Sequence, residues 1–271
     1  MLNLLRADLY GLKNSKGLLY TVLVGAVLIA ALVVVFKYAN IDTGMLSHGR
    51  VPPGTDVFGI SLADLHRIPG SIDIAFRAAG KGDFIPLMIA VFVCIYVTNE
   101  FSYGTIKNIL AVGNKKTSFY ISKLITVSLS SVIIFSSIVL ASFIAGSFLF
   151  RLSSEISDVA QLLQTLALQL LLHIAYAAIF FMIAALIKNT GISIAVSVGV
   201  LIFLRLLFLA ADWIFKTGSS IQSFYLAVNI TDLTVPSPTI NMIARALLVG
   251  FACIIVPTVA GSLIFSRQDV N

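Results

Sequence analysis

The sequence predicts an all-α integral membrane protein with six transmembrane helices, an N-terminal amphipathic interfacial helix and a short cytoplasmic helix. Two observations lead to this fold class. The 271 residues are 59% hydrophobic and only 11% charged, with a mean hydropathy of +1.02, which is far from the balance of a soluble domain. The apolar residues also form long runs, and roughly 18 or more uncharged residues in a row predict a membrane-spanning helix. We therefore expect a single transmembrane domain over residues 1–271.

The predicted spans are separated by polar segments. They cover residues 18–36, 84–98, 124–150, 162–187, 191–211 and 240–265. Ahead of the first span, the leucines of residues 1–17 recur at three- and four-residue intervals, whereas Arg6 and Lys13 lie on other faces. This pattern is typical of a helix in the membrane interface. A cleaved signal peptide is disfavoured because the apolar run that follows is too long for one.

Lysine and arginine in the short loops predict the orientation. The segments between spans two and three and between spans four and five are basic, whereas the short loops on the other side have Arg151 and Lys216 against four acidic residues. Because basic loops stay on the cytoplasmic side, both termini are predicted to be cytoplasmic. Residues 37–83 then form an extracytoplasmic loop.

Composition and motifs disfavour several function classes. The formal net charge of +6 does not indicate nucleic-acid binding, because the basic residues cluster beside apolar runs and there meet lipid headgroups. No P-loop pattern occurs, so the chain is predicted to be no enzyme and to bind no ATP itself. Cys94 and Cys253 lie inside apolar runs and predict no disulfide or metal cluster. His173 is interpreted as forming a helix-packing hydrogen bond.

The polar segment 99–123 separates spans two and three. Within it, "TIKNILAV" at residues 105–112 places Ile106, Ile109 and Leu110 on one face and predicts a short amphipathic helix. A helix of about eight residues is not stable alone in water. It therefore needs a surface to pack against, and the residues alone leave open whether this is the membrane or a groove in a partner protein.

The stretch "NEFSYGTIKNILAVGNKKTSFYISKLI" resembles the segment after the second span in permeases of type-two ATP-binding-cassette (ABC) exporters of the six-span type. The family pattern has an acidic residue, Gly-Thr, a short helix, a basic turn and Ser-Lys at the start of the third span. The matching positions are Glu100, Gly104, Thr105, Lys107, Lys115, Lys116, Ser122 and Lys123. Lysines stand at 115 and 116, where the family often has an arginine.

The resemblance implies that residues 99–123 are a cytoplasmic coupling segment that docks on a separate ATPase. The coupling residues implied are Glu100, Gly104, Thr105, Ile106, Lys107, Ile109, Leu110, Lys115 and Lys116. It further implies a homodimer of two permeases with two cytosolic ABC ATPase subunits, among the lipids of a bacterial plasma membrane. ATP and Mg²⁺ are then bound by the partner subunit, and no cofactor by this chain.

The implied function is export of amphipathic or antimicrobial peptides or other lipophilic substrates. The competing hypothesis is a stand-alone polytopic membrane protein, such as a secondary transporter or an assembly factor. Secondary transport predicts acids buried within the spans or broken helices paired between the two halves of the chain. The sequence shows neither pattern, so we favour the exporter.

Arg205 is the one charge well inside an apolar run. A charge in hydrocarbon is costly, so this side chain is expected either to face a polar cavity in the bundle or to extend to the outer interface. Both alternatives stay open, and Arg205 is a candidate residue of the translocation path. The triplet Asn-Ile-Thr at Asn229 matches a glycosylation acceptor, which is a weak pattern.

Overall fold

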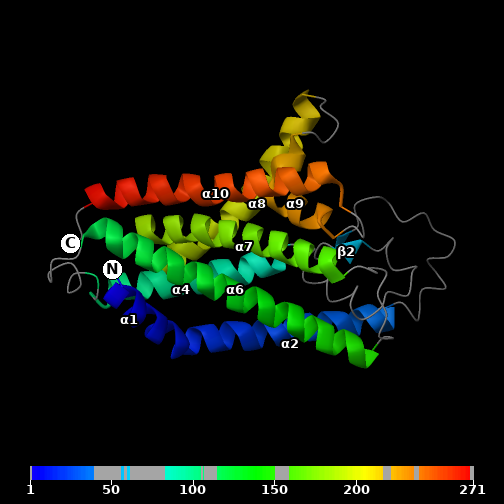
Figure 1. The fold of residues 1–271 in the computed structure, drawn as a ribbon, viewed down its shortest axis with the longest axis horizontal. Coiled ribbons are helices and arrows are strands. Elements are labelled where there is room, and N and C mark those ends of the chain that lie inside the picture. Colours follow the sequence, from blue (N-terminus) through cyan, green and yellow to red (C-terminus); the bar gives the residue numbers. More distant parts are fainter. Residues whose placement is uncertain are drawn as a thin grey trace.

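The computed structural model of the chain describes residues 2–39, 56–57, 60–61, 83–104, 106, 115–149, 159–215, 221–234 and 238–268. Six of the helices that it describes are long and apolar enough to cross a membrane, and they form one elongated bundle (Figure 1). These helices are α2 (Lys16–Ala39), α4 (Phe84–Ser102), α6 (Lys116–Leu149), α7 (Val159–Ile187), α8 (Thr190–Phe215) and α10 (Ile240–Arg267). The predicted all-α class with six spans is confirmed.

Shorter elements lie at the two ends of the bundle. Helix α1 (Leu2–Lys13) precedes α2, as the sequence predicts. The 3-10 helix η3 (Gln222–Phe224) and helix α9 (Leu226–Asp232) lie between α8 and α10 and were not predicted. In the segment 37–83, strand β1 (Asp56–Val57) pairs antiparallel with β2 (Ile60–Ser61), a hairpin that the sequence analysis also missed. The predicted helix at 105–112 lies outside the described residues except for Ile106.

Helix α7 occupies the centre of the bundle. About 56% of its span is buried, against 17% in α2 and α8, and it contacts α4, α6, α8 and α10. Small side chains allow these close approaches, because helices in lipid pack where residues are small. The buried alanines of α7 are Ala175, Ala177, Ala178, Ala184 and Ala185.

Helix α8 lies at the periphery. Its buried residues are Ser193, Ser197 and Leu201, all in its first half, and in Figure 1 its C-terminal part leaves the side of the bundle. Beyond Leu201, large apolar side chains such as Phe203, Leu206 and Trp213 are exposed. This part of α8 therefore presents an apolar surface that the described chain does not cover.

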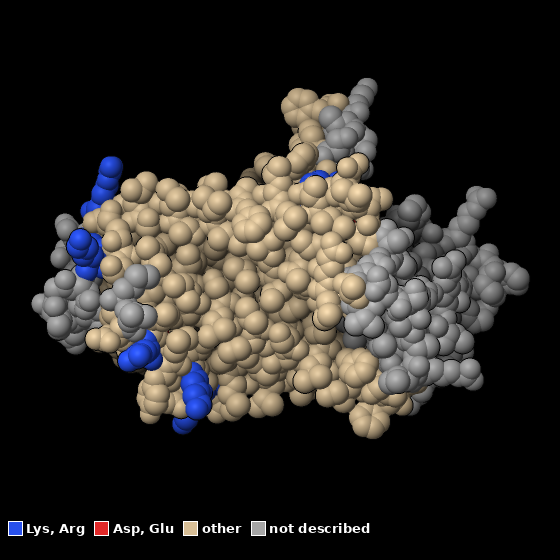
Figure 2. Space-filling model, viewed as in Figure 1, with Lys and Arg blue, Asp and Glu red and all other residues tan. Residues whose placement is uncertain are grey.

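The two ends of the bundle differ in charge. On the face shown in Figure 2, Lys and Arg of the described residues gather mainly at one end. That end contains α1, the starts of α2, α6 and α8, and the ends of α4, α7 and α10, and we call it the basic end. The opposite end, with α9, is the distal end. The basic end carries Arg6, Lys13, Lys16, Lys115, Lys116, Lys123, Lys188 and Arg267.

Candidate functional site

Three charged side chains from three helices meet at the basic end. The Nζ of Lys123 on α6 lies 2.6 Å from Oδ1 of Asp8 on α1 and also donates to Oε1 of Glu100 on α4. The side chains of Lys123, Asp8 and Glu100 are 3%, 7% and 20% exposed. Buried charges are stable only when they are paired and hydrogen-bonded. We call these three residues the ion cluster.

Neighbouring groups fix the ion cluster in place. The hydroxyl of Ser122 donates to Oδ2 of Asp8 at 2.7 Å, so both carboxylate oxygens of Asp8 have a partner. The Tyr96 hydroxyl donates to the Asp8 carbonyl at 3.5 Å. The rings of Tyr96 and Phe119 lie 5.4 and 5.7 Å from Nζ of Lys123, within the range of cation–ring attraction. Helix α1 is thereby fastened to both α4 and α6.

The predicted coupling segment, residues 99–123, contains Glu100 and Lys123 of this cluster. Helix α4 ends before Gly104, whose φ of +67° is a left-handed conformation that glycine adopts without strain. Ile106, only 1% exposed, then packs back into the bundle. Ile106 lines a cavity of about 10 Å³, barely the size of one water, together with Glu100 and Lys123. Ile106 of the predicted coupling segment is therefore held in the core near the ion cluster.

The other predicted coupling residues have different surroundings. Lys115 is exposed just before α6. The Nζ of Lys116 donates to the carbonyls of Ser266 and Gln268 at 3.4 and 2.6 Å, at the end of α10, where a cation complements the helix dipole. The structure thus brings Glu100 and Ile106 together and joins Lys116 to α10. Four predicted coupling residues lie outside the described residues, namely Thr105, Lys107, Ile109 and Leu110.

Residues 79–206 match the family model described as ABC-2 family transporter protein. This range extends from just before α4 to the second half of α8 and includes the coupling segment with Glu100 and Lys123. The match and the six apolar helices fit a permease subunit of an ABC-2 type transporter. No curated protein sequence matches the chain.

The class of permease that this match fits has general properties. Such a permease is the membrane component of its transporter, is generally not catalytic itself and implies an ATPase partner subunit. The six apolar helices agree with a multi-pass membrane protein. The sequence analysis inferred a resemblance to type-two ABC permeases from residues 99–123, and this resemblance is confirmed.

Arg205 of the permease lies far from the ion cluster. Its side chain is 57% exposed, and Nη1 lies 3.6 Å from Oδ2 of Asp83, the residue that precedes α4 at the distal end. Burial raises the pKa of Asp83, and the charge of Arg205 opposes part of that rise. The pair joins the exposed helix α8 to the distal start of α4. Asp83 was not among the predicted site residues, since it lies 122 positions from Arg205 in the sequence.

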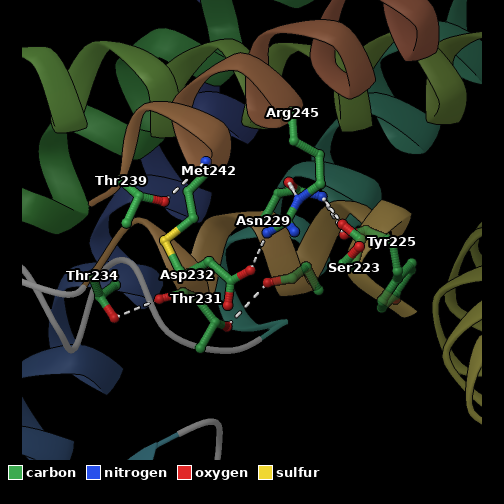
Figure 3. Close-up of polar contacts among 10 residues, drawn as sticks. Ser223, Tyr225, Asn229, Thr231, Asp232, Thr234, Thr239, Met242 and Arg245 are labelled. Carbon is green, nitrogen blue, oxygen red and sulfur yellow. Dashed lines mark hydrogen bonds and ion pairs between the residues drawn. The ribbon is translucent and has the colours of Figure 1, made fainter. Parts of the chain in front are cut away.

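A second polar network holds α9 at the distal end of the permease (Figure 3). Arg245 of α10 donates from Nε to Oδ1 of Asn229 at 3.1 Å and from Nη2 to Asp232. The amide nitrogen of Asn229 donates to the carbonyls of Ser223 and Tyr225 at 2.8 and 2.9 Å. Burial raises the pKa of Asp232, while Arg245 opposes the rise. The amide nitrogen of Asn229 is engaged in these hydrogen bonds and the residue is only 1% exposed. Asn229 is therefore not a glycosylation acceptor in this fold.

His173 does not form the predicted hydrogen bond to another helix among the described residues. Its Nδ1 bonds to the carbonyl of Gln169 at 2.7 Å within α7, and its ring packs on Phe135 of α6 with centroids 4.8 Å apart. The imidazole ring of His173 thus makes the contact between α7 and α6, whereas its hydrogen bond stays within α7. Among the described residues, no group of three His, Cys, Asp or Glu is placed to hold a metal ion.

Asp8 is the residue of the ion cluster that the sequence reasoning missed. It lies one turn before Leu12, and these two are the buried residues among the side chains of α1 at positions 3–13, whereas Arg6 and Lys13 are exposed. An acid on the apolar face of an interfacial helix was the available signal, since such a residue needs a cation from the protein. Lys123, a cation near the start of a span, is the partner that this acid requires.

Proposed function

We propose that the chain is the transmembrane subunit of an ATP-driven exporter that works as two permeases with two cytosolic ABC ATPase subunits. The single observation that supports this best is the family match over residues 79–206, because it contains the coupling segment. The basic end is proposed to face the cytoplasm, with both chain termini, since lysine and arginine mark the cytoplasmic side. ATP and Mg²⁺ are bound by the ATPase partner.

The proposed cargo is an amphipathic or antimicrobial peptide or another lipophilic molecule, exported from a bacterial plasma membrane. Arg205 is kept as a residue of the translocation path. Its partial exposure on the peripheral helix α8 supports this, because a charge at membrane depth is stable when it faces a partner or a polar space. Arg205→Leu is expected to reduce transport with little change in membrane abundance.

The proposed mechanism passes motion from the ATPase into the bundle through residues 105–112. Closure of the ATPase pair displaces this segment. Ile106 transmits the displacement because its side chain is packed among helices, and its neighbours include Val97 of α4, Phe119 of α6 and Phe265 of α10. The ion cluster extends the same connection to α1 through Asp8. The two permeases then switch between inward-open and outward-open or closed states.

The test measures recovery of the ATPase with the permease. Ile109→Asp places a charge on the apolar face of the coupling segment, and Asn14→Asp adds the same charge at an exposed position of the basic end. The ATPase that co-purifies with the unmodified permease should be lost from Ile109→Asp and retained by Asn14→Asp, at equal membrane insertion. Full recovery and full transport with Ile109→Asp would mean that the segment only lies on the membrane surface.

A further inference from the structure

Next to the ion cluster, a cavity of about 240 Å³ lies between the start of α2 and the second half of α4. Its walls combine three aromatic rings with a carboxylate and neutral polar groups. The lining used in the argument is Phe92, Tyr96, Tyr103, Glu100, Asn99 and Thr21. Tyr103 is 80% exposed, so the cavity borders the surface of the permease. It has room for roughly eight water-sized groups.

The charge beside this cavity is unbalanced. Among the described residues of the ion cluster, the carboxylates of Asp8 and Glu100 share the single ammonium of Lys123. With all three ionised, the cluster carries one excess negative charge. Both oxygens of Asp8 are engaged by Lys123 and Ser122, and of the two acids Glu100 is the one in the cavity wall. The excess charge therefore acts toward the cavity, where it attracts a cation.

The rings select the kind of cation. Phe92 and Tyr96 stack with centroids 5.5 Å apart, and aromatic faces attract ammonium groups more readily than strongly hydrated metal ions. Lys123 already uses this chemistry, since its Nζ contacts Glu100 and lies over the Tyr96 ring. An ammonium group with a short alkyl chain fits both the volume and the lining.

The position of the cavity indicates what carries the ammonium. Gly17 and Thr21 belong to the first turns of α2, and a 24-residue helix exceeds the roughly 20 residues that cross the hydrocarbon. The cavity thus lies at the depth of the lipid headgroups. Lys13 and Lys16 are exposed beside it in sequence, and such lysines attract phosphate. An amphiphile in the same leaflet can place its cation in the cavity and its chains in the membrane.

We propose that this cavity binds the ammonium group of a membrane amphiphile, with Glu100 as its counter-ion and Phe92 and Tyr96 as its aromatic walls. Two sources have this chemistry, the headgroup of an aminophospholipid and a cationic amphipathic molecule. Binding needs only the permease, so it goes beyond the proposed export function and does not depend on an ATPase.

The experiment measures ligand retention by native mass spectrometry on the delipidated, purified permease. The probes are phosphatidylethanolamine, phosphatidylglycerol and dodecylamine, each added alone. Gly17→Leu is designed to fill the cavity while all three residues of the ion cluster are kept, and a Cβ at Gly17 would lie 3.5 Å from Oγ of Ser15 and 4.0 Å from the Phe92 ring, both ordinary contacts. Glu100→Gln removes the counter-ion. Asp83→Asn is the control, since it neutralises a carboxylate at the opposite end of the same helix.

Retention of phosphatidylethanolamine or dodecylamine is expected to exceed that of phosphatidylglycerol and to fall roughly tenfold in Gly17→Leu and Glu100→Gln. Asp83→Asn should match the unmodified permease. Retention of phosphatidylethanolamine identifies a lipid headgroup as the source, and retention of dodecylamine alone identifies a cationic amphiphile. The proposal is overturned if phosphatidylglycerol is retained as well as both amines, or if Gly17→Leu retains them undiminished.

Discussion

Gly261 of α10 faces Tyr120 of α6. A Cβ at Gly261 would lie 2.0 Å from Oη and 2.8 Å from Cζ of Tyr120, and 3.0 Å from Cγ of Met182. Tyr120 cannot retreat, because it is 1% exposed and its ring packs on Phe181 and Phe265 at centroid distances of 4.7 and 5.9 Å. The absence of a side chain at position 261 is therefore what lets α6 and α10 meet.

Gly261→Ala is expected to destabilise the permease by about 1–3 kcal/mol, the usual cost of overpacking a core. Gly199→Ala is the matched control, because no atom lies within 4 Å of the Cβ that it adds. The measurement is thermal unfolding in detergent, followed by the reaction of a fluorogenic maleimide with the buried thiol of Cys94. Equal unfolding temperatures for the two variants would contradict the expected clash.

Removal of Lys123 should damage the permease more than removal of Asp8. Lys123→Met leaves two carboxylates without their cation, and breaking a buried ion pair in this way costs about 3–5 kcal/mol. Asp8→Asn keeps the Lys123–Glu100 pair and an acceptor for Ser122, so we expect a smaller loss. The same unfolding assay ranks the variants, and the reverse order would show that Lys123 is not the centre of the cluster.

Helix α9 depends on side chains rather than on its own length. Its seven residues are too few for independent stability. Arg245 anchors it to α10, and the carboxylate of Asp212 at the end of α8 accepts hydrogen bonds from the backbone nitrogens of Ile221 and Gln222 at 3.0 and 2.9 Å. The distal turn between α8 and α10 is thus held at both of its ends.

Arg245→Met is expected to loosen α9 and leave the bundle intact. Without the guanidinium, Asn229 and Asp232 lose their bond to α10, so backbone amides of residues 226–232 should exchange with deuterium at least several-fold faster. Arg267→Met, which changes an exposed arginine at the other end of α10, serves as the control. Unchanged exchange in α9 after Arg245→Met would mean that apolar contacts alone hold it.

The six apolar helices could be predicted from hydropathy. Elements that depend on contacts between distant residues, such as α9, could not. Each span was visible because hydrophobicity is a property of consecutive residues. The third span was predicted over residues 124–150, and α6 extends from Lys116 to Leu149. The helix thus begins eight residues before the predicted span, because its polar first turns are satisfied by α10 and by the ion cluster. Helix α9 has no local signal. Asp8 does have one, as an acid on the apolar face of its helix, but its partner Lys123 could not be identified because it lies 115 positions away in the sequence.

At the scale of the whole molecule, the Lys and Arg side chains of the described residues gather mainly at one end of the bundle on the face shown in Figure 2. This asymmetry predicts that the basic end is cytoplasmic. In a background without reactive cysteines, Lys115→Cys should react with a membrane-impermeant maleimide only after the cells are opened. Thr239→Cys, at the exposed distal start of α10, should react in intact cells. The opposite labelling pattern would invert the orientation.

Helix α6 contains 34 residues, which at 1.5 Å per residue is about 51 Å, whereas the hydrocarbon of a bilayer is about 30 Å thick. The helix must therefore tilt or extend beyond the hydrocarbon, and the ion cluster lies in its first turns. Hydrophobic mismatch then acts on those charges directly. A thicker bilayer draws Lys123 and its two carboxylates toward hydrocarbon, and a thinner one leaves them among hydrated headgroups. Lipid chain length thereby becomes a variable that sets the stability of the connection between α1, α4 and α6.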